Sequence, residues 1–386
     1  MQQTEPIRKN NASLKQKKGK ADWIIFFLTY MLVLIGLLMV YSSSSIQAQF
    51  DRNSNYDSMF FLKKQFKFVI LGTIALFIGY KINYRLYKKF AWYIYGLNIF
   101  LLVITRFTPL GTISSGGKRW LNLGFMSFQT SEFSKFAIII IIAYFISQNK
   151  NRMNRTSSII IPLVLAGITF LLILIQPSLS AGLILMITAI AMLFIGGMSY
   201  FHTFVLFVTG VLGTYIMSKS AAYRQDRINS YLDPFNDVTG KGYQIVNSIL
   251  AIASGNLMGV GYGKSTQKYF YIPQPQNDFI FSIYAEEFGF IGCILLIALF
   301  LVLIYRIFSL FISVEDVFAK MIVSGIGLLI GIQMFLHIAV VSGLVPNTGI
   351  GLPFISYGGT SIMMFLFMIG ILLNISKNRK ALQKIK

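Results

Sequence analysis

The sequence 271-YIPQPQNDFIFSIYAEEFG-289 joins a polar, proline-containing loop to a long apolar run at a single carboxylate, Asp278. The chain has only 13 acidic residues, so an aspartate at the boundary between water and hydrocarbon needs an explanation. Asn277 or Asp278 could be the N-cap of the helix that follows, where a side-chain oxygen and a negative charge are stabilising. Alternatively, Asp278 could be a catalytic or ion-binding acid. Position alone favours the N-cap.

Similar apolar runs recur along the whole chain of 386 residues, which is 55% hydrophobic and only 12% charged. A soluble domain carries about twice that charged fraction, and runs of roughly twenty apolar residues are typical of membrane-spanning helices. The runs are continuous and do not alternate, which argues against a membrane β-barrel. We therefore expect an all-α polytopic integral membrane protein with about ten transmembrane helices in one membrane domain, residues 22–376. The predicted spans lie near 23–42, 67–83, 90–107, 132–148, 158–176, 180–197, 200–218, 279–308, 319–345 and 357–375.

Positive charge is distributed unevenly between the two sides that these spans define. The tails, residues 1–21 and 377–386, are basic, whereas the short loops near 176–180 and 346–357 contain no Lys or Arg. Because cytoplasmic segments are enriched in Lys and Arg, we predict that both termini are cytoplasmic and that Asp278 faces outward. This asymmetry also accounts for the net charge of +21, so we expect no nucleic-acid partner.

The scarcity of cysteine and histidine excludes several kinds of site. Cys293 is the only cysteine, and His202 and His337 also lie in apolar surroundings. A disulfide framework is impossible, and a zinc site is not expected. Any metal would be a hard cation held by oxygen atoms.

Two cationic motifs lie near the predicted outer surface. In 116-GGKRW-120, two adjacent cations beside a tryptophan suit a phosphate-bearing lipid, although ordinary anchoring at the membrane interface explains them equally well. Glu132 and Lys135 are three residues apart at the start of a span, so they would share a helix face and form an ion pair. A charged pair in an apolar helix end also marks a cavity more often than a lipid-facing surface.

A large outer loop, residues 219–278, separates the seventh and eighth predicted helices. Its half-apolar part, residues 243–262, could lie flat on the membrane or re-enter it, but is too short and broken to span. The glycine-rich segment 255-GNLMGVGYGKS-265 could offer backbone N–H groups to an anion. It lacks the Walker spacing, which argues against nucleotide binding.

The segment 346-PNTGIGLPFISYGGTS-361 combines two prolines with several glycines between two spans. Irregular backbone near membrane depth is tolerated only where it is buried or lines a cavity. We therefore consider it either a cavity wall opposite Asp278 or a simple tight connection. Glu286 lies too far along its helix to form a carboxylate pair with Asp278, and we expect Glu286 and Glu287 to pair with cations of other spans.

Taken together, these motifs resemble the SEDS family of bacterial cell-wall polymerases, whose members include FtsW, RodA and SpoVE, and they are most similar to the FtsW branch. The resemblance extends from about residue 23 to residue 376, and the order of several motifs makes it specific. The matching motifs are G-x-x-R-W at 116–120, Q-P-S-E-x-x-K at 129–135 with Thr130 for proline, Y-Q-x-x-x-S at 243–248, D-F-I-F at 278–281, E-E-x-G at 286–289 and P-x-T-G-x-x-L-P-F-x-S-Y-G-G-[ST] at 346–360.

The resemblance implies a peptidoglycan glycosyltransferase that uses lipid II, a disaccharide-pentapeptide on undecaprenyl pyrophosphate, as both donor and acceptor. It implies that Asp278 is the catalytic residue and that Glu132 and Lys135 are functional positions. Cations are needed near the pyrophosphate leaving group. The candidate residues for the substrate cavity and the pyrophosphate are Arg119, Glu132, Lys135, Lys264, Lys268 and Ser356.

Asp278 could take the proton of the acceptor hydroxyl, or hold a divalent cation, Mg²⁺ or Mn²⁺, that activates this hydroxyl. We expect no organic cofactor. The resemblance also implies a class B penicillin-binding protein transpeptidase and other divisome membrane proteins as partners. The expected location is the bacterial cytoplasmic membrane at the division septum.

The chain departs from the family pattern at several positions. Ser178 replaces an aspartate, Gln274, Gln276 and Asn277 replace glutamate, histidine and threonine, and His337 replaces an asparagine. Three alternatives therefore stay open: a lipid II flippase or transporter, an elongation polymerase of the RodA type, and a divisome scaffold whose site has decayed. The polar motifs lie towards the outer face, which favours chemistry there over transport through the membrane midplane.

Overall fold

We describe the chain from a computed structural model. The structure describes residues 21–114, 117–122, 124, 126–219, 230–234 and 241–377. Most of both predicted tails, Gly116 of the G-x-x-R-W motif and two parts of the large outer loop therefore lie outside the described residues.

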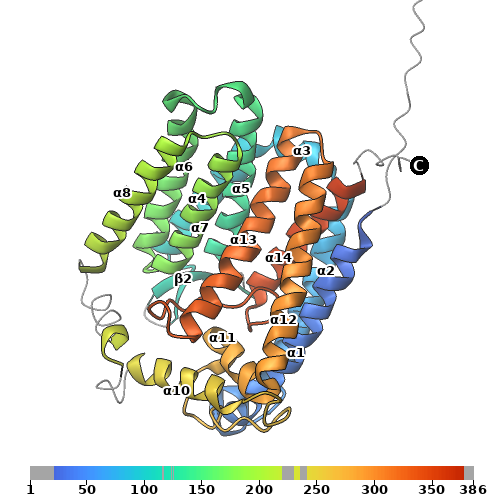
Figure 1. Cartoon of the computed structure of the whole chain (residues 1–386), viewed down its shortest axis with the longest axis vertical. Helices are drawn as coiled ribbons and strands as arrows, with labels where there is room; N and C mark the ends of the chain where they lie inside the picture. The colour runs from blue at the N-terminus through green and yellow to red at the C-terminus, as the bar shows by residue number, and fades with distance from the viewer. Residues whose placement is uncertain are drawn as a thin grey trace, which may run out of the picture.

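Long apolar helices lie side by side in one bundle (Figure 1). Their bounds are α1 (Trp23–Phe50), α2 (Phe60–Lys81), α4 (Ala91–Phe107), α5 (Thr130–Gln148), α6 (Thr156–Ile175), α7 (Leu179–Ile195), α8 (Tyr200–Lys219), α12 (Ile280–Ser313), α13 (Val317–Val341) and α14 (Gly359–Lys377). Each overlaps one predicted span, and six helices in the described part of the chain are long and apolar enough to cross a membrane. The polytopic all-α class is confirmed, whereas the number of ten spans stays a prediction.

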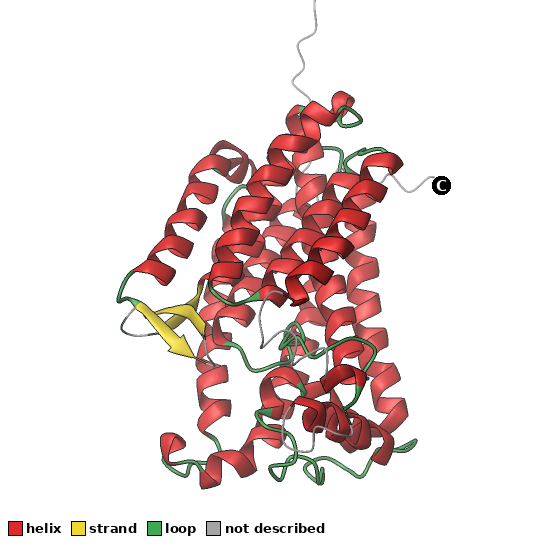
Figure 2. Cartoon of the chain, turned by 90° about the vertical axis from the view of Figure 1, so that its left-hand side faces the viewer, coloured by secondary structure: helices red, strands yellow, loops and turns green. Residues whose placement is uncertain are grey.

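Shorter elements connect these helices. They are η1 (Arg52–Ser54), α3 (Tyr84–Lys89), η2 (Lys150–Arg152), α10 (Lys241–Ser254), α11 (Pro275–Asp278), β1 (Gly111–Ser114), β2 (Gly117–Asn122) and β3 (Ser127–Gln129). The strands, which the sequence did not predict, form one antiparallel sheet in the order β1-β2-β3. Trp120 of β2 lies opposite Thr112 and Gln129, and Figure 2 shows the sheet at one edge of the bundle.

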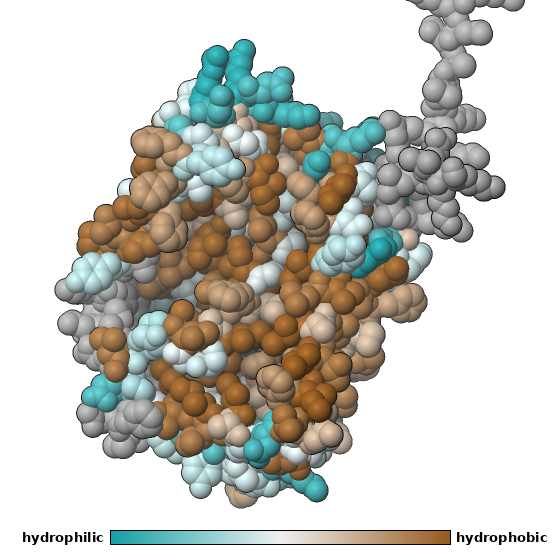
Figure 3. All heavy atoms as spheres, in the orientation of Figure 1, coloured by the Kyte–Doolittle hydropathy of each residue, from teal (hydrophilic) through white to brown (hydrophobic). Residues whose placement is uncertain are grey.

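The surface has the distribution expected of a membrane protein. Apolar residues form a broad band across the face in Figure 3, and hydrophilic residues gather at its two ends. The start of α1 and the end of α14 lie together, because the Asp22 N–H donates to Ser376 Oγ at 2.9 Å. They lie at the end of the bundle opposite α10 and α11 (Figure 1). The start of α1 and the end of α14 thus lie on one side of the bundle; that this side is cytoplasmic stays a prediction.

Glycines allow α2 and α14 to pack at backbone distance. A Cβ at Gly370 of α14 would lie 2.1 Å from Leu76 O, and a Cβ at Gly79 of α2 would lie 2.6 Å from Phe367 O. Approaches this close are possible only where the side chain is missing, as is common between membrane helices. The close packing of α2 against α14 therefore depends on glycine at these positions.

The helix α12 is broken at Gly289, whose φ of 65° and ψ of −167° are not helical. The glycine-rich segment 255–265 fills this break. The N–H groups of Val260 and Gly261 donate to α12 backbone carbonyls, each at 3.0 Å. The prediction that these N–H groups bind an anion is therefore wrong for Val260 and Gly261, since the backbone of the broken helix already accepts their hydrogen bonds.

We expect Gly289→Ala to destabilise the protein. A Cβ at this position would lie 2.3 Å from Gly259 N, and the positive φ adds strain of about 1–3 kcal/mol for a residue with a side chain. The measurement is the melting temperature of the purified protein in detergent. Gly167→Ala on α6 is the matched control, because its Cβ would meet nothing within 4 Å. Equal melting temperatures for the two variants would contradict this account of the break.

The helix α10 lies across the end of the bundle and does not run parallel to the long helices (Figure 1). It packs mainly against α12. Ser248 Oγ of α10 donates to Val341 O at 2.6 Å and lies 2.6 Å from Ser282 Oγ. This part of the outer loop therefore closes the bundle end at which Asp278 lies.

Candidate active site

Asp278 is the last residue of α11, a single helical turn, and is not an N-cap. Pro275 is at the start of this turn, a position that its fixed φ favours. The N-cap of α12 is Phe279, which has no side-chain capping bond. The prediction that Asn277 or Asp278 caps α12 is therefore wrong, because the proline starts a separate turn that ends at Asp278.

The carboxylate of Asp278, which is half-buried, lies against the irregular segment that the sequence predicted to be either its opposite wall or a simple tight connection. We call residues 346–358 the site loop. A Cβ at Gly349 of the site loop would lie 3.3 Å from Asp278 Oδ2, and Gly349 has a φ of +67°. The N–H of Tyr357 donates to Gln276 O at 2.9 Å, which attaches the end of the site loop to α11. The two segments therefore lie in contact, whereas the cavity between them stays a prediction.

Polar side chains from three helices hold the backbone of the site loop. Buried irregular backbone needs such partners, because its carbonyls cannot all bond to one another. The bonds run from Ser180 of α7 to Thr348 O, from His337 of α13 to Ile350 O at 2.7 Å, from Gln333 of α13 to Gly351 O at 2.9 Å, and from Gln65 of α2 to Ser356 O at 3.3 Å. These roles were not predicted from the sequence, where polar residues inside apolar helices were the available signal.

Glu132 and Lys135 form the predicted ion pair at the start of α5. Lys135 Nζ lies 2.7 Å from Glu132 Oε1, and both side chains are buried. Lys135 Nζ also donates to Gln333 Oε1 at 3.1 Å. Because Gln333 bonds to the site loop, one amide connects this ion pair to the segment that lies against Asp278.

Arg119 joins the small sheet to the turn between α6 and α7. Its Nε donates to Gln176 O at 3.1 Å, and its Nη2 donates to Pro177 O. Ser178 is the N-cap of α7 without a side-chain capping bond, and Ser180 in the first turn of α7 holds the site loop. Arg119 therefore supports the turn that leads into α7 and to Ser180; whether it also binds phosphate stays a prediction.

Lys268 is part of a buried ion pair. Its Nζ lies 3.3 Å from Glu287 Oε1, and Ser42 of α1 donates to the same oxygen at 2.5 Å. The prediction that Glu287 pairs with a cation is confirmed, but this cation comes from the outer loop and not from another span. Burial, and secondarily the charge of Glu287, raise the pKa of the nearby Tyr262 phenol. This ion pair gives Lys268 a structural role in the outer loop, and its predicted role at the pyrophosphate stays a prediction.

Glu286 accepts hydrogen bonds from the outer loop. Thr266 donates its N–H at 2.8 Å and its hydroxyl at 2.9 Å, and Ser265 Oγ and the Gln267 N–H also donate. The prediction that Glu286 pairs with a cation of another span is wrong, because hydroxyl and N–H groups of residues 265–267 surround its carboxylate. Glu286 thus fixes the loop that leads to Lys268.

The two remaining predicted residues lie in loops. Ser356 Oγ accepts the N–H of Leu352 at 2.7 Å, so it closes a turn inside the site loop. Lys264 is exposed at the end of the glycine-rich segment.

A divalent cation would have few acidic ligands at this site. Within the described ranges, no three His, Cys, Asp or Glu side chains come together. Two buried oxygens beside the Asp278–Gly349 contact, Asn277 Oδ1 and Thr348 Oγ1, lack a hydrogen-bond partner among the described residues. One carboxylate with neutral oxygens is compatible with Mg²⁺, which usually keeps several waters and binds substrate phosphates.

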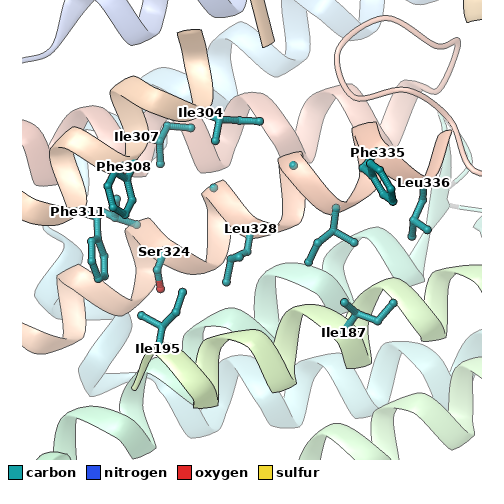
Figure 4. A pocket seen from close by; sticks show the side chains of 14 residues that line it. Ile187, Ile195, Ile304, Ile307, Phe308, Phe311, Ser324, Leu328, Phe335 and Leu336 are labelled. Atoms are coloured by element: carbon teal, nitrogen blue, oxygen red, sulfur yellow. The ribbon is translucent and has the colours of Figure 1, made fainter. Parts of the chain in front are cut away.

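An apolar groove between α7, α12 and α13 is separate from these residues. Figure 4 shows isoleucine, leucine and phenylalanine side chains around it, with Ser324 as the labelled hydroxyl. The groove has a volume of about 500 Å³, and its lining contains no acidic or basic residue. Such a surface suits hydrocarbon and not proton transfer.

Comparison with known sequences identifies relatives that match nearly the whole chain. Residues 22–381 match the sequence model of a cell cycle protein family named for FtsW, RodA and SpoVE. Stage V sporulation protein E of Bacillus subtilis (strain 168) is 38% identical and covers 94% of this chain and 98% of that protein. The "Probable peptidoglycan glycosyltransferase FtsW" of Geobacter sp. (strain M18) is 35% identical and covers 92% of this chain and 96% of that protein.

Solved structures share the fold. The crystal structure of the rod shape determining protein RodA of Thermus thermophilus has a TM-score of 0.69 at 23% identity, and the alignment covers 94% of this chain and 98% of that one. A chain from a peptidoglycan synthase complex has a TM-score of 0.77 at 24% identity, with 93% and 98% covered. The resemblance found in the sequence motifs is confirmed: this chain belongs to the FtsW/RodA/SpoVE family of cell cycle proteins.

Proposed function

We propose that this chain is a peptidoglycan glycosyltransferase that polymerises lipid II into glycan strands at the outer face of the cytoplasmic membrane. The observation that carries the proposal is the position of the half-buried Asp278 carboxylate against Gly349 of the site loop. Side chains from three helices hold the backbone of this loop in place. The names of the FtsW relatives support the same activity.

The reaction requires one proton acceptor. The 4-hydroxyl of the acceptor sugar attacks the anomeric carbon of the donor and forms the new C–O bond, while the bond to the lipid pyrophosphate breaks with its electron pair. Asp278 takes the hydroxyl proton, as a positioned general base. Because the Asp278 carboxylate lies against the backbone of the site loop, it needs little reorganisation before it accepts the hydroxyl proton.

The leaving pyrophosphate needs positive charge. Arg119 at the sheet and the exposed Lys264 are our candidates, because a guanidinium or ammonium group stabilises phosphate oxygens. We assign Lys135 an indirect role, since its ammonium group is buried against Glu132. A divalent cation held by Asp278, Asn277 Oδ1, Thr348 Oγ1 and the substrate would add Lewis-acid stabilisation when bound.

We place this polymerase in septal wall synthesis during cell division. The sequence Met39–Ser42 in α1 resembles the division-type branch, and FtsW proteins are among the relatives. A class B penicillin-binding protein is the proposed partner, because the chain shares its fold with a member of a complex that coordinates polymerization and crosslinking. An elongation polymerase is the alternative.

The purified chain, incubated with labelled lipid II, should extend glycan strands alone or with a class B penicillin-binding protein. Product length on gels is the measurement, and a parallel sample treated with chelator and then with Mg²⁺ tests the cation. Movement of lipid II across liposomes without chain growth would replace this proposal with a flippase. No strand growth under either condition would leave the scaffold alternative.

A further inference from the structure

The amide of Gln333 occupies a position that only a neutral amide of its length can satisfy. Gln333 lies on α13 and is 3% exposed. Its Oε1 accepts from Lys135 Nζ at 3.1 Å, and its Nε2 donates to Gly351 O at 2.9 Å. An ammonium group can only donate and a carbonyl can only accept, so the orientation of the amide is fixed by its two neighbours.

Other residues cannot make both contacts. A glutamate at position 333 would keep the contact with Lys135 but would set a carboxylate oxygen against Gly351 O. A methionine of similar length would leave both the ammonium and the carbonyl without a partner. Each loss occurs in a buried region, where an unsatisfied polar group is costly.

The contact made by Gln333 is close to the Asp278 carboxylate. Gly351 is two residues from Gly349, which lies against Asp278 Oδ2. The neighbouring carbonyl, Ile350 O, accepts from His337 Nδ1 at 2.7 Å, one helical turn along α13 from Gln333. One face of α13 therefore fixes two successive carbonyls of the site loop.

We propose that Gln333 is a positioning residue for glycosyl transfer, which couples the buried Glu132–Lys135 pair to the site loop and so sets the backbone surface against which Asp278 works. The proposal rests on the function proposed above for Asp278. It also explains why the Glu132–Lys135 ion pair is buried: Lys135 orients the amide of Gln333, and this amide orients the site loop.

The test compares steady-state polymerisation by the wild type, Gln333→Met and Gln333→Glu. Both variants should lose about tenfold or more in kcat, because displacement of a catalytic site by about 1 Å has effects of this size. KM for lipid II should stay within about twofold, since Gln333 is buried and does not bind the substrate. Gln333→Glu keeps its contact with Lys135, so an equal loss in both variants identifies the bond to Gly351 as the important one.

Asn374→Leu is the control for a purely structural effect. Asn374 is a buried amide on α14 that donates to Tyr80 O at 2.7 Å and accepts from the Tyr84 N–H at 3.1 Å, at the other end of the bundle from Asp278. This variant should lower the melting temperature without lowering kcat. The inference is overturned if Gln333→Met or Gln333→Glu keeps kcat within twofold of wild type, or if Asn374→Leu loses kcat in proportion to its melting temperature.

A double-mutant cycle gives a second readout. If Lys135 acts through Gln333, adding Gln333→Met to Lys135→Met should cost much less than it costs in the wild type. Full additivity of the two losses would contradict the coupling. Failure of the wild type to polymerise, or activity of an Asp278→Asn variant, would instead refute the proposed function, so the two failures are distinguishable.

Discussion

Asp278→Asn should abolish glycan polymerisation and leave the fold intact. Asparagine has nearly the same size but cannot accept a proton, and loss of a general base costs about 10²–10⁴-fold in rate. Asp278 is not the N-cap of α12, so the substitution removes no capping bond from that helix. The measurement is strand formation from labelled lipid II, with the melting temperature recorded on the same preparation.

The control for Asp278→Asn is Asp57→Asn. Asp57 is an exposed carboxylate in the loop between α1 and α2, and its ion pair with Lys63 at 2.7 Å is of a kind that contributes little to stability. This variant should polymerise lipid II at the wild-type rate. An Asp278→Asn protein that retains more than about a tenth of the wild-type rate would exclude Asp278 as the general base.

Lys268→Met should destabilise the protein by about 3–5 kcal/mol, because it leaves the carboxylate of Glu287 buried without its cation. The side chains of Lys268 and Glu287 are 3% and 0% exposed. The melting temperature in detergent should fall clearly. Adding Glu287→Gln should restore part of the loss, since the double variant buries no unpaired charge.

Lys264→Met is the matched control, because Lys264 lies four residues earlier and is exposed. It should leave the melting temperature unchanged, whatever it does to activity. If Lys268→Met instead lowers activity at an unchanged melting temperature, Lys268 contacts the substrate and our structural assignment is wrong. The pair of variants thus separates a lysine that holds the outer loop from one that binds phosphate.

Hydropathy was sufficient to place the long helices, because a helix that crosses hydrocarbon must be apolar over its whole length. The break in α12 was not predictable in this way. Gly289 lies within an apolar run, and its positive φ depends on the segment 255–265 that inserts beside it. The sheet at residues 111–129 was missed because its strands are only three to six residues long.

The site was predicted in part. Asp278 was a candidate because an isolated acid is conspicuous at the end of a polar loop, and the segment that contacts it at Gly349 was a candidate because prolines and glycines mark irregular backbone. The N-cap alternative failed because Pro275 starts a turn of its own. Gln333 was missed because a neutral amide changes no charge count, and its partner Lys135 lies 198 residues away, so only tertiary packing brings them together.

The glycine contacts between α2 and α14 have a consequence for biogenesis. The two helices are far apart in the sequence, yet at their glycines the backbone of one occupies the space that a side chain of the other would need. During synthesis, α2 is made long before α14, its packing partner. Until α14 is inserted, the glycine face of α2 is exposed to lipid. The contact between α2 and α14 therefore forms only after α14 has been synthesised, so the glycine face of α2 stays without this packing partner until then.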